Sequence, residues 1–386
     1  MKEYLAKQFQ VTYQEEADLF LSCGGRFEVL GNHTDHNRGL CLAATCSLSE
    51  YAAFKKRKDK TIRLLSEGYG NFEVDLSSLN MIDNEKGGST AMIRGIAKYL
   101  SDKGYKIGGF DAYIKSELPR GAGVSSSAAF ELLIAQAFNT LFNDSKIELI
   151  TLCHASQFAE REYYGKPCGL LDQVGVSFGG VTFIDFKDVL TPTIRKFYVD
   201  SKDYQFVIIN TGGNHAELTE LYRKIQNQMF EVAAVFGQSY LRDVNYEDLK
   251  KNKQDVIEKC GKEAYQKAVH FFEENKRVEK AVDALEKEDI AALVELMNKS
   301  RESSTKFLGN MYVDKIKGSP LEACKLVLKA SHQKAGVKVN GGGFAGSVIA
   351  LVPNKEVNAV VKAAKEKYGK ENVYLVDVRN EKPSEM

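Results

Sequence analysis

The chain has 386 residues, of which 44% are hydrophobic and 27% are charged, as in folded globular proteins. Its formal net charge of +1 gives no electrostatic reason to expect nucleic acid or an anionic membrane as a partner, so small ligands fit it better. No apolar run approaches the ~18 residues of a membrane span, and the first ten residues lack the apolar core of an export signal. The seven cysteines are scattered without paired spacing, so we expect a cytoplasmic protein with reduced thiols.

This length exceeds what one hydrophobic core usually supports, so two domains with a cleft between them are expected. Alternating and small apolar residues predict strands up to about residue 60, including "RFEVL" at 26–30. The segment 128–142 is apolar on nearly all faces, which predicts a helix buried at the centre of its domain. The other elements expected in the first half are a helix at 89–104, a strand at 110–119, a helix at 148–164 and a strand at 180–186.

In the second half the pattern starts again with the apolar strand "QFVIIN" at 205–210, followed by several helices up to about residue 329. The chain then closes with a strand at 346–352, a helix at 354–369 and a strand at 372–378, an order that suits an α+β layer. We place the boundary so that an N-terminal domain spans 1–195 and a C-terminal domain spans 196–386.

A glycine-rich loop and the start of the apolar helix form the segment "PRGAGVSSSAAFELL" at 119–133. Gly121 and Gly123 lack Cβ atoms, so the backbone can turn tightly and approach a ligand while the unpaired N–H groups of the following helix point back at the loop. This arrangement predicts an anion site, in which the three serines that follow contact phosphate oxygens or ligate magnesium. Neither a Walker A nor a Rossmann pattern is present. The alternative is that the serines only cap a buried helix.

A second glycine-rich loop, "VNGGGFAGS" at 339–347, lies directly before an apolar strand. Three consecutive glycines cost considerable chain entropy, which indicates a close approach of the backbone to a ligand, although a wide hairpin or a bulge is the alternative.

Two carboxylates are candidates for the chemistry of phosphoryl transfer. Glu160 ends a helix, and Asp172 lies among small and apolar neighbours in "PCGLLDQVG". Carboxylate and hydroxyl oxygens hold magnesium in such reactions, and an aspartate beside a substrate hydroxyl can accept its proton. Taken alone, an acidic residue at a helix end such as Glu160 is also compatible with a solvated surface charge.

Together these stretches resemble the galactokinases, which form the GHMP superfamily with the homoserine, mevalonate and phosphomevalonate kinases. The first of them is similar to the galactokinase sugar-binding signature G-R-[VI]-N-[LIV]-I-G-E-H-T-D-Y-N-G-G. The others are similar to the phosphate loop, the catalytic segment, part of the C-terminal domain and the C-terminal glycine motif of that family. In chain order the matching stretches are 25–40, 119–131, 160–173, 210–224 and 339–347.

The resemblance implies an α+β fold of two domains, the N-terminal one like ribosomal protein S5 domain 2 and the C-terminal one ferredoxin-like. It also implies a transferase of galactose metabolism that uses ATP and Mg2+ to phosphorylate the C1 hydroxyl of galactose in the cleft between the domains. Catalysis then comes chiefly from positioning and charge neutralisation. The residues at the family's functional positions are Asp172 and Arg26 for catalysis; Asn32, His33, Asp35, Gly169, Tyr222 and Gly342 for the sugar; Gly121, Ala122, Gly123, Val124, Ser125, Ser126 and Ser127 for the nucleotide; and Ser127 and Glu160 for the metal ion.

The sequence departs from the family pattern mainly in the sugar-binding signature. Asn32 stands where galactokinases carry Glu, and Glu28 stands where they carry Asn. His36 replaces a Tyr and Arg38 a small residue. The resemblance puts the signature Glu near the C6 hydroxyl, so loss of a negative charge there changes which C6 group is accepted. A sugar carboxylate could accept hydrogen bonds from Asn32, His33 and Arg38, which makes galacturonokinase the alternative to galactokinase.

The sequence is also compatible with a non-catalytic role and with a different sugar. Some galactokinase relatives bind galactose and ATP but regulate transcription through a protein partner, yet this chain keeps Arg26, Glu160 and Asp172, which favours catalysis. The His33-Thr34-Asp35 core of the signature also leaves N-acetylgalactosamine open as the substrate. Milder replacements lie in the C-terminal glycine motif, where Asn340 replaces a common Thr and Ser347 a Cys. A monomer is compatible with the sequence, which does not fix the oligomeric state.

Overall fold

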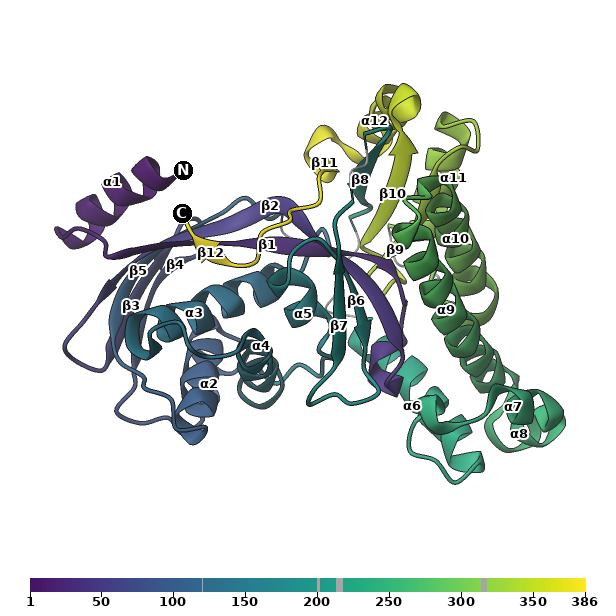
Figure 1. The fold of residues 1–386 in the computed structure, drawn as a ribbon, viewed down its shortest axis with the longest axis horizontal. Helices are drawn as coiled ribbons and strands as arrows, with labels where there is room; N and C mark the ends of the chain where they lie inside the picture. Colours follow the sequence, from purple (N-terminus) through teal and green to yellow (C-terminus); the bar gives the residue numbers. More distant parts are fainter. Residues whose placement is uncertain (120, 200–201, 213–217, 314–317) are drawn as a thin grey trace.

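The computed structural model describes residues 1–119, 121–199, 202–212, 218–313 and 318–386. These residues form two sheets, each with helices packed against it, and the first sheet extends towards the second along two long strands (Figure 1). This mixed α+β arrangement confirms the predicted fold class.

The first sheet has eight strands, in the order β12-β1-β2-β5-β3-β4, with β6 joined to β2 and β7 joined to β6. All pairs are antiparallel except β3 with β5. The strands are β1 (Leu19–Leu30), β2 (Leu40–Lys56), β3 (Thr61–Ser66), β4 (Gly70–Asp75), β5 (Phe110–Ser116), β6 (Val181–Asp185), β7 (Thr193–Phe197) and β12 (Ser384–Glu385).

Helices cover both faces of this sheet, with α1 on one face and α2 to α5 on the other (Figure 1). The predicted central helix is present as α3, whose apolar side chains are buried, because helices pack around it as well as the sheet. The prediction of strands from the start of the chain is wrong for α1, where Leu5 and Phe9, one helical turn apart, pack against the sheet. The helices are α1 (Lys2–Tyr13), α2 (Ser89–Asp102), α3 (Ser126–Asn143), α4 (Leu149–Phe158) and α5 (Leu171–Ser177).

The second sheet has four antiparallel strands in the order β11-β8-β10-β9. One face packs against α11 and α12, and the other faces α9, α10 and the first sheet, so its strands are apolar on both sides. The strands are β8 (Tyr204–Asn210), β9 (Gly336–Asn340), β10 (Ser347–Pro353) and β11 (Val373–Val376). The helices of this half are α6 (Thr219–Val235), α7 (Tyr246–Lys251), α8 (Lys253–Cys260), α9 (Lys262–Glu286), α10 (Ile290–Ser303), α11 (Pro320–Ala330) and α12 (Asn354–Tyr368).

Short helical turns complete the chain at Asp35–Asn37, Asp83–Glu85, Ala159–Tyr164, Leu241–Asp243, Ser304–Leu308 and Lys370–Asn372. The change from the first sheet to the second falls between Phe197 and Tyr204, and the domain boundary near residue 195 stays a prediction. The end of the chain returns to the first sheet, where β12 pairs with β1, so the last residues do not pack with the second sheet.

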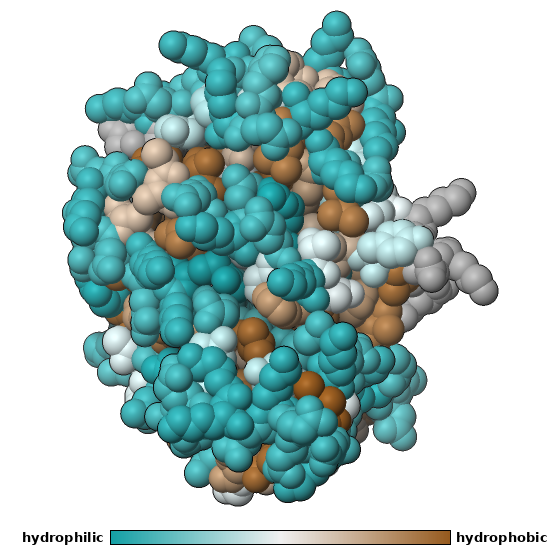
Figure 2. All heavy atoms as spheres, turned by 90° about the vertical axis from the view of Figure 1, so that its right-hand side faces the viewer, coloured by the Kyte–Doolittle hydropathy of each residue, from teal (hydrophilic) through white to brown (hydrophobic). Residues whose placement is uncertain are grey.

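The strand β1 links the two halves, because it pairs with β2 and β12 in the first sheet and also contacts β9, β10, α9 and α10. Its far end carries the buried polar residues Arg26 and Glu28, where an ordinary strand core is apolar. The face that carries the C-terminal helices is largely hydrophilic, with scattered apolar residues (Figure 2). The polar interior at the end of β1 therefore points to a functional site between the sheets.

Candidate active site

A cavity of about 1100 Å³ lies where the end of β1, the start of α3 and the loops of the second sheet meet. Every site residue predicted from the sequence lines it except Ala122, which is buried and uses its carbonyl to accept a hydrogen bond from Ser347. A cavity of this size can hold a nucleotide together with a small sugar. The predicted residues on its wall are Arg26, Asn32, His33, Asp35, Gly121, Gly123, Val124, Ser125, Ser126, Ser127, Glu160, Gly169, Asp172, Tyr222 and Gly342.

Arg26 and Asp172 form an ion pair on the cavity wall. Nε and Nη2 of the arginine donate to Oδ1 of the aspartate at 2.9 and 2.7 Å, so its second oxygen is not held by the guanidinium. Burial by itself raises the pKa of Asp172, but the positive charges of Arg26 and Lys166 outweigh that effect and leave the pKa below its usual value. The aspartate is therefore ionised at neutral pH.

The glycine-rich loop before α3 has the geometry of an anion site. Gly121 and Gly123 have positive φ values of 72° and 65°, and Ser125 takes the same left-handed region at 55°, although it has a Cβ atom. The side chain of Ser125 does not cap the first amides of α3, so the alternative that this serine only caps the helix is wrong. The carbonyl of Gly123 accepts hydrogen bonds from Arg26 and Asn340, at 2.6 and 2.9 Å. The loop is therefore tied to both halves of the chain, with helix amides left for a ligand.

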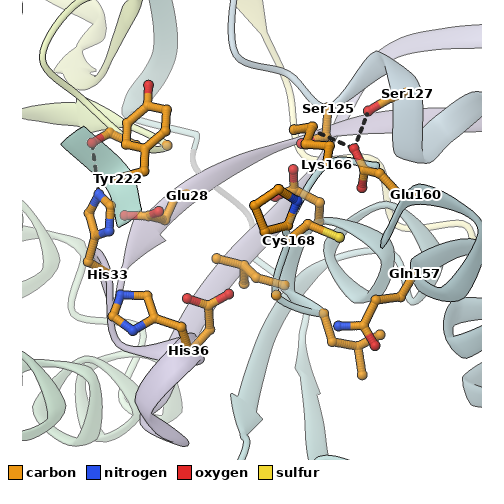
Figure 3. A pocket seen from close by; sticks show the side chains of 18 of the residues that line it. Glu28, His33, His36, Ser125, Ser127, Gln157, Glu160, Lys166, Cys168 and Tyr222 are labelled. Carbon is orange, nitrogen blue, oxygen red and sulfur yellow. Dashed lines mark hydrogen bonds and ion pairs between the residues drawn. The ribbon is translucent and has the colours of Figure 1, made fainter. Parts of the chain in front are cut away.

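Glu160 lies beside this loop, in a wide helical turn that continues α4. One oxygen of its buried carboxylate contacts Ser127 Oγ at 3.5 Å and the Lys166 ammonium at 2.6 Å (Figure 3). Burial disfavours the charge of Lys166, but the Glu160 carboxylate more than compensates and raises the pKa of the lysine. Ser127 and Glu160, the residues predicted as metal ligands, are therefore adjacent. Glu160 lies in a wide helical turn, and such turns are frequent at functional sites.

Two residues behind Glu160 were not predicted from the sequence. The Gln173 amide donates to Glu160 Oε2 at 3.0 Å and to Glu131 Oε2 at 3.2 Å, and both partners are buried. Burial and the neighbouring charge of Glu160 raise the pKa of Glu131 well above its usual value. Glu131 lies within the stretch that resembles the family's phosphate loop, but only its burial on α3 marks it as part of the site.

Asp35 lies directly against Gly169 on the cavity wall. A Cβ atom at Gly169 would overlap the Asp35 carboxylate, so only glycine fits against this side chain. Burial, with the charge of Asp172 adding to it, raises the pKa of Asp35 to about 6. The charged form of such a buried carboxylate is stabilised by hydrogen-bond donors. A ligand with adjacent hydroxyl groups can supply these donors.

The loop after β1 is held by backbone contacts with the glycine loop of the second sheet. The His33 ring bonds to the carbonyl of Gly342 at 2.8 Å, and the Tyr222 ring lies over that glycine, where a Cβ atom would clash (Figure 3). His33 and Arg38 both have positive φ values, which is uncommon for residues with a side chain. Strained backbone of this kind persists where the surroundings enforce it, often at ligand sites.

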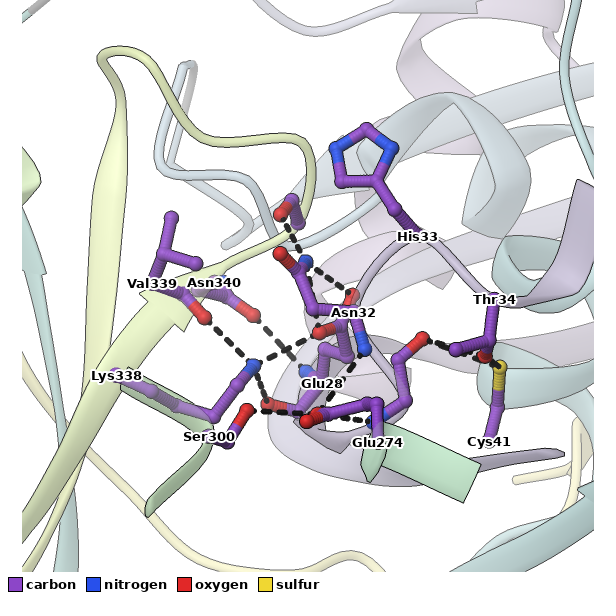
Figure 4. A network of polar contacts seen from close by, with 12 residues as sticks. Glu28, Asn32, His33, Thr34, Cys41, Glu274, Ser300, Lys338, Val339 and Asn340 are labelled. Atoms are coloured by element: carbon purple, nitrogen blue, oxygen red, sulfur yellow. Dashed lines mark hydrogen bonds and ion pairs between the residues drawn. The ribbon is translucent and has the colours of Figure 1, made fainter. Parts of the chain in front are cut away.

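Asn32 also lies between the loop after β1 and the glycine loop of the second sheet, but the polar atoms of its side chain already have protein partners. Its amide Nδ2 donates to Glu28 Oε1 at 3.0 Å and to the carbonyl of Gly341 at 2.7 Å, and its Oδ1 accepts from Asn310 at 2.8 Å (Figure 4). Glu28 in turn pairs with Lys338 at 2.8 Å. Position 32 therefore lacks the carboxylate of the family signature, but the carboxylate of Glu28, paired with Lys338, contacts Asn32 directly.

The helix α9 supplies a second support that sequence patterns did not reveal. Glu274 Oε1 accepts the backbone N–H of Gly31 at 3.0 Å and of Asn32 at 3.4 Å, and its Oε2 accepts from Arg277 at 2.6 Å. His270 contacts the carbonyl of Asn32 at 3.0 Å. The only sequence signal was acidic and basic side chains on an amphipathic helix, which ordinarily indicates a solvated face.

The seven cysteines are free, as predicted, and Cys168 lines the cavity. Burial raises the pKa of this thiol, so it is not a nucleophile at neutral pH. Within the described parts of the chain, no helix has both the length and the apolarity needed to cross a membrane.

The cavity thus combines a glycine-rich loop at a helix start, an ionised aspartate paired with an arginine, and a second carboxylate whose pKa is raised by burial. The fold and the site together define a kinase of the GHMP class, and the family model described as "GHMP kinases N terminal domain" matches residues 91–180. Mevalonate kinase from Methanococcus jannaschii has a similar fold, with a TM-score of 0.66 over 94% of this chain and 98% of that one, at 16% identity.

Within that class the chain belongs to the galactokinase family. Galactokinase from Fusobacterium nucleatum is 30% identical over 379 residues, which cover 95% of this chain and 94% of that protein. Galactokinase from Clostridium tetani is 28% identical over 95% of this chain and 92% of its own length. The model "Galactokinase galactose-binding signature" matches residues 7–56. A Lactococcus lactis galactokinase complexed with galactose shares the fold over all of both chains, with a TM-score of 0.85 at 24% identity.

Proposed function

We propose that the protein transfers the γ-phosphoryl group of ATP to the C1 hydroxyl of galactose and so forms galactose 1-phosphate. The observation that carries this proposal is the Arg26–Asp172 ion pair. It lies on a cavity wall shared by the phosphate loop and by the loop after β1, residues 31–39, which we call the sugar loop. Membership of the galactokinase family supports the same reaction.

Asp172 receives the C1 hydroxyl of the sugar in this proposal. Because its pKa is lowered, the carboxylate is ionised and can accept the hydroxyl proton or stabilise the positive end of the hydroxyl dipole as the phosphoryl group arrives. Arg26 holds Asp172 by one oxygen and holds the phosphate loop through the carbonyl of Gly123. Arg26 therefore fixes the position of Asp172 relative to the phosphate loop. Such positioning is the main contribution of a protein to phosphoryl transfer.

The amides at the start of α3 and the serines of the loop receive the phosphates, with the helix dipole favouring their negative charge. Ser127 and Glu160 fit Mg2+, because one hard carboxylate and one hydroxyl, together with phosphate oxygens and water, form its usual environment. When bound, Mg2+ neutralises charge on the phosphates. Lys166 pairs with Glu160 and adds a second positive charge on this side of the cavity.

The sugar is proposed to lie against Asp35, His33, Gly169 and Tyr222. Asp35 can accept hydrogen bonds from two adjacent hydroxyls, and Gly169 leaves space for the carboxylate to reach them. Asn32 supports this site from behind rather than through a free side chain, because both of its polar atoms have protein partners.

Galacturonate is the weaker candidate. Arg38 and His33 line the cavity, as that alternative expected, but the Asn32 amide, which was expected to meet a sugar carboxylate, donates to Glu28 and Gly341 instead. The non-catalytic sensor is disfavoured because Arg26, Asp172 and Glu160 all line the cavity. The cytoplasmic location expected from the sequence remains a proposal, and the oligomeric state stays open, with a monomer compatible with the sequence.

The test is a turnover assay with the purified full chain, ATP and Mg2+. We expect ADP release with galactose and weak or no release with galacturonate, N-acetylgalactosamine and glucose. Asp172→Asn should lower kcat by roughly a thousandfold with little change in KM for ATP. Asp185→Asn, which alters a carboxylate outside the cavity wall, is the matched control. Absence of turnover with every sugar would overturn the proposal.

A further inference from the structure

Two residues near the end of β1 contact one another, and their residue types are interchanged relative to the family signature. Glu28, on β1, and Asn32, in the loop that follows, occupy positions where the family signature has Asn and Glu. The Asn32 amide donates to both oxygens of the Glu28 carboxylate, at 3.0 and 3.3 Å (Figure 4). The pair therefore retains one carboxylate and one carboxamide at the same junction, with the carboxylate now carried by the strand.

Lys338, on β9, holds the carboxylate in place. Its side chain is completely buried, and its ammonium donates to Glu28 Oε1 at 2.8 Å, to the Glu28 carbonyl at 3.3 Å and to the Val339 carbonyl at 2.7 Å. A buried ammonium without a partner is costly, so the ion pair with Glu28 offsets the burial of Lys338 and holds the carboxylate in position. Glu28 contributes to the cavity wall, whereas Lys338 reaches the carboxylate from the neighbouring sheet.

The second carboxylate oxygen of Glu28, Oε2, can accept a further hydrogen bond. Among the described residues only Asn32 donates to Oε2, at 3.3 Å, and a carboxylate oxygen can accept about two hydrogen bonds. The negative charge of Glu28 also acts across the cavity, since it contributes to the raised pKa of Asp35 after burial and the charge of Asp172. A ligand in the sugar half of the cavity therefore meets the carboxylates of Glu28 and Asp35.

Asn32 fixes the orientation of this carboxylate. Its amide nitrogen is shared between Glu28 and the carbonyl of Gly341, and its oxygen accepts from Asn310, which also donates to the carbonyl of Gly342 at 3.0 Å. A glutamate at position 32 beside Glu28 would leave two carboxylates facing one ammonium. An asparagine at position 28 would leave Lys338 without its counter-charge. Neither position can change alone without an unbalanced buried charge.

We propose that Glu28, Asn32 and Lys338 form one substrate-selecting unit, in which Glu28 accepts a hydrogen bond from a hydroxyl of a neutral sugar and disfavours an anionic sugar. This inference rests on the proposed function, because it assumes that the cavity binds a sugar. Asn32 and Lys338 act as positioning residues, since they act on the sugar through Glu28.

The test is an exchange of the two residue types in the full chain. Glu28→Asn and Asn32→Glu should each raise KM for galactose by roughly tenfold or more while KM for ATP changes by less than about twofold. The double variant Glu28→Asn/Asn32→Glu should return to within about threefold of the unaltered protein, because one carboxylate and one amide again surround Lys338. The matched control is Glu295→Asn, which breaks an exposed pair with Lys299 on α10.

A third variant isolates the charge. Glu28→Gln keeps the size of the side chain and should lower the preference for galactose over galacturonate, measured as the ratio of kcat/KM values, by about tenfold. An unchanged ratio would overturn the selecting role of Glu28.

The remaining outcomes are also decisive. If the effects of the two single changes multiply in the double variant, the positions act independently and the unit does not exist. Equal rises in KM for ATP and for galactose would reduce Glu28 to a structural role. If the unaltered protein phosphorylates no sugar, the proposed function and the selecting role of Glu28 both fail. Recovery of the melting temperature in the double variant would then show only that the two positions share one buried network.

Discussion

The two ends of the cavity are built in different ways. At the phosphate end, Asp172, Glu160 and Ser127 come from short motifs of the first half of the chain, and the two carboxylates are held by side chains of that same half. At the sugar end, Asn32 and Glu28 are fixed by residues of the second half, and most of their polar atoms are already used by the protein.

This contrast shows where each part of the reaction is specified. Phosphates and a metal ion need exposed donors and acceptors, which a helix start and two or three side chains can supply locally. Selection among sugars requires carboxylates and loops held in one geometry, and here the second half of the chain supplies that support. Sugar binding should therefore be sensitive to substitutions far from the ligand. Phosphoryl transfer should be sensitive mainly to substitutions of residues that line the cavity.

The largest effect is expected at the phosphate end from Glu160→Gln. The substitution removes the hard carboxylate and leaves Lys166 without its counter-charge, so kcat should fall by about a hundredfold and a higher Mg2+ concentration should be needed. Initial rates measured over a Mg2+ titration check this. Glu162→Gln, on the exposed side of the same turn, is the control and should behave as the unaltered protein. A normal Mg2+ requirement in Glu160→Gln would remove Glu160 from the proposed metal site.

Glu274→Gln probes the same contrast from the sugar end. The change replaces a buried acceptor of the Gly31 amide with a side chain that cannot satisfy Arg277, so the free energy of unfolding should fall by about 3 kcal/mol. KM for galactose should rise by roughly tenfold while KM for ATP stays within about twofold, because the loop that Glu274 holds carries the residues proposed to contact the sugar. Denaturant unfolding and steady-state kinetics measure both effects. The neighbouring Glu273→Gln, at a half-exposed position, is the matched control.

The same glutamate gives the stability a defined pH dependence. Burial alone raises the pKa of Glu274, but the charges of Arg277 and His270 outweigh it and lower the pKa to about 2, from an ordinary 4.5. A carboxylate with a lowered pKa in the folded state stabilises fully above pH 4.5, and this contribution is lost as the pH falls towards 2. The difference in unfolding free energy between the unaltered protein and Glu274→Gln should therefore shrink over that interval. A constant difference would contradict the assignment.

Gly169→Ala tests the contact between the catalytic segment and the sugar loop. The added methyl group overlaps the Asp35 carboxylate, so Asp35 must move and KM for galactose should rise by about tenfold. KM for ATP serves as the internal control, because the three atoms nearest to the added methyl group all belong to Asp35. A change in KM for ATP of the same size would show that the two ends are not separable.

The smallest predicted effect is a pH dependence of sugar use. Since the pKa of Asp35 is raised to about 6, the carboxylate of the free protein becomes protonated below that pH and loses acceptor capacity. The kcat/KM for galactose should fall by up to about tenfold per pH unit below pH 6. Burial lowers the pKa of both His33 and His36, so these neighbours stay neutral in this range. Asp35→Asn should abolish the pH step, and a step that persists would assign it to another group.

The phosphate end could be predicted from the sequence because its chemistry is local. Gly121, Gly123 and the serines lie within a few residues of one another, and a glycine-rich turn before an apolar helix has few other structural solutions. Gln173 lies next to Asp172 in the chain, yet its contact with Glu131 depends on how α3 and α5 pack. The helix α1 was missed because only the register of Leu5 and Phe9 against the sheet distinguishes it from a polar segment.

The amino-acid sequence was sufficient for the fold class, the galactokinase family and the motif residues that reach the cavity. Those features rest on short stretches whose backbone preferences and residue types act over a single turn or loop. Only the three-dimensional packing established that Glu28 and Asn32 share a buried network and that Lys338 and Glu274 support it. A buried charge finds its partner where distant elements pack together, and linear spacing does not encode that distance.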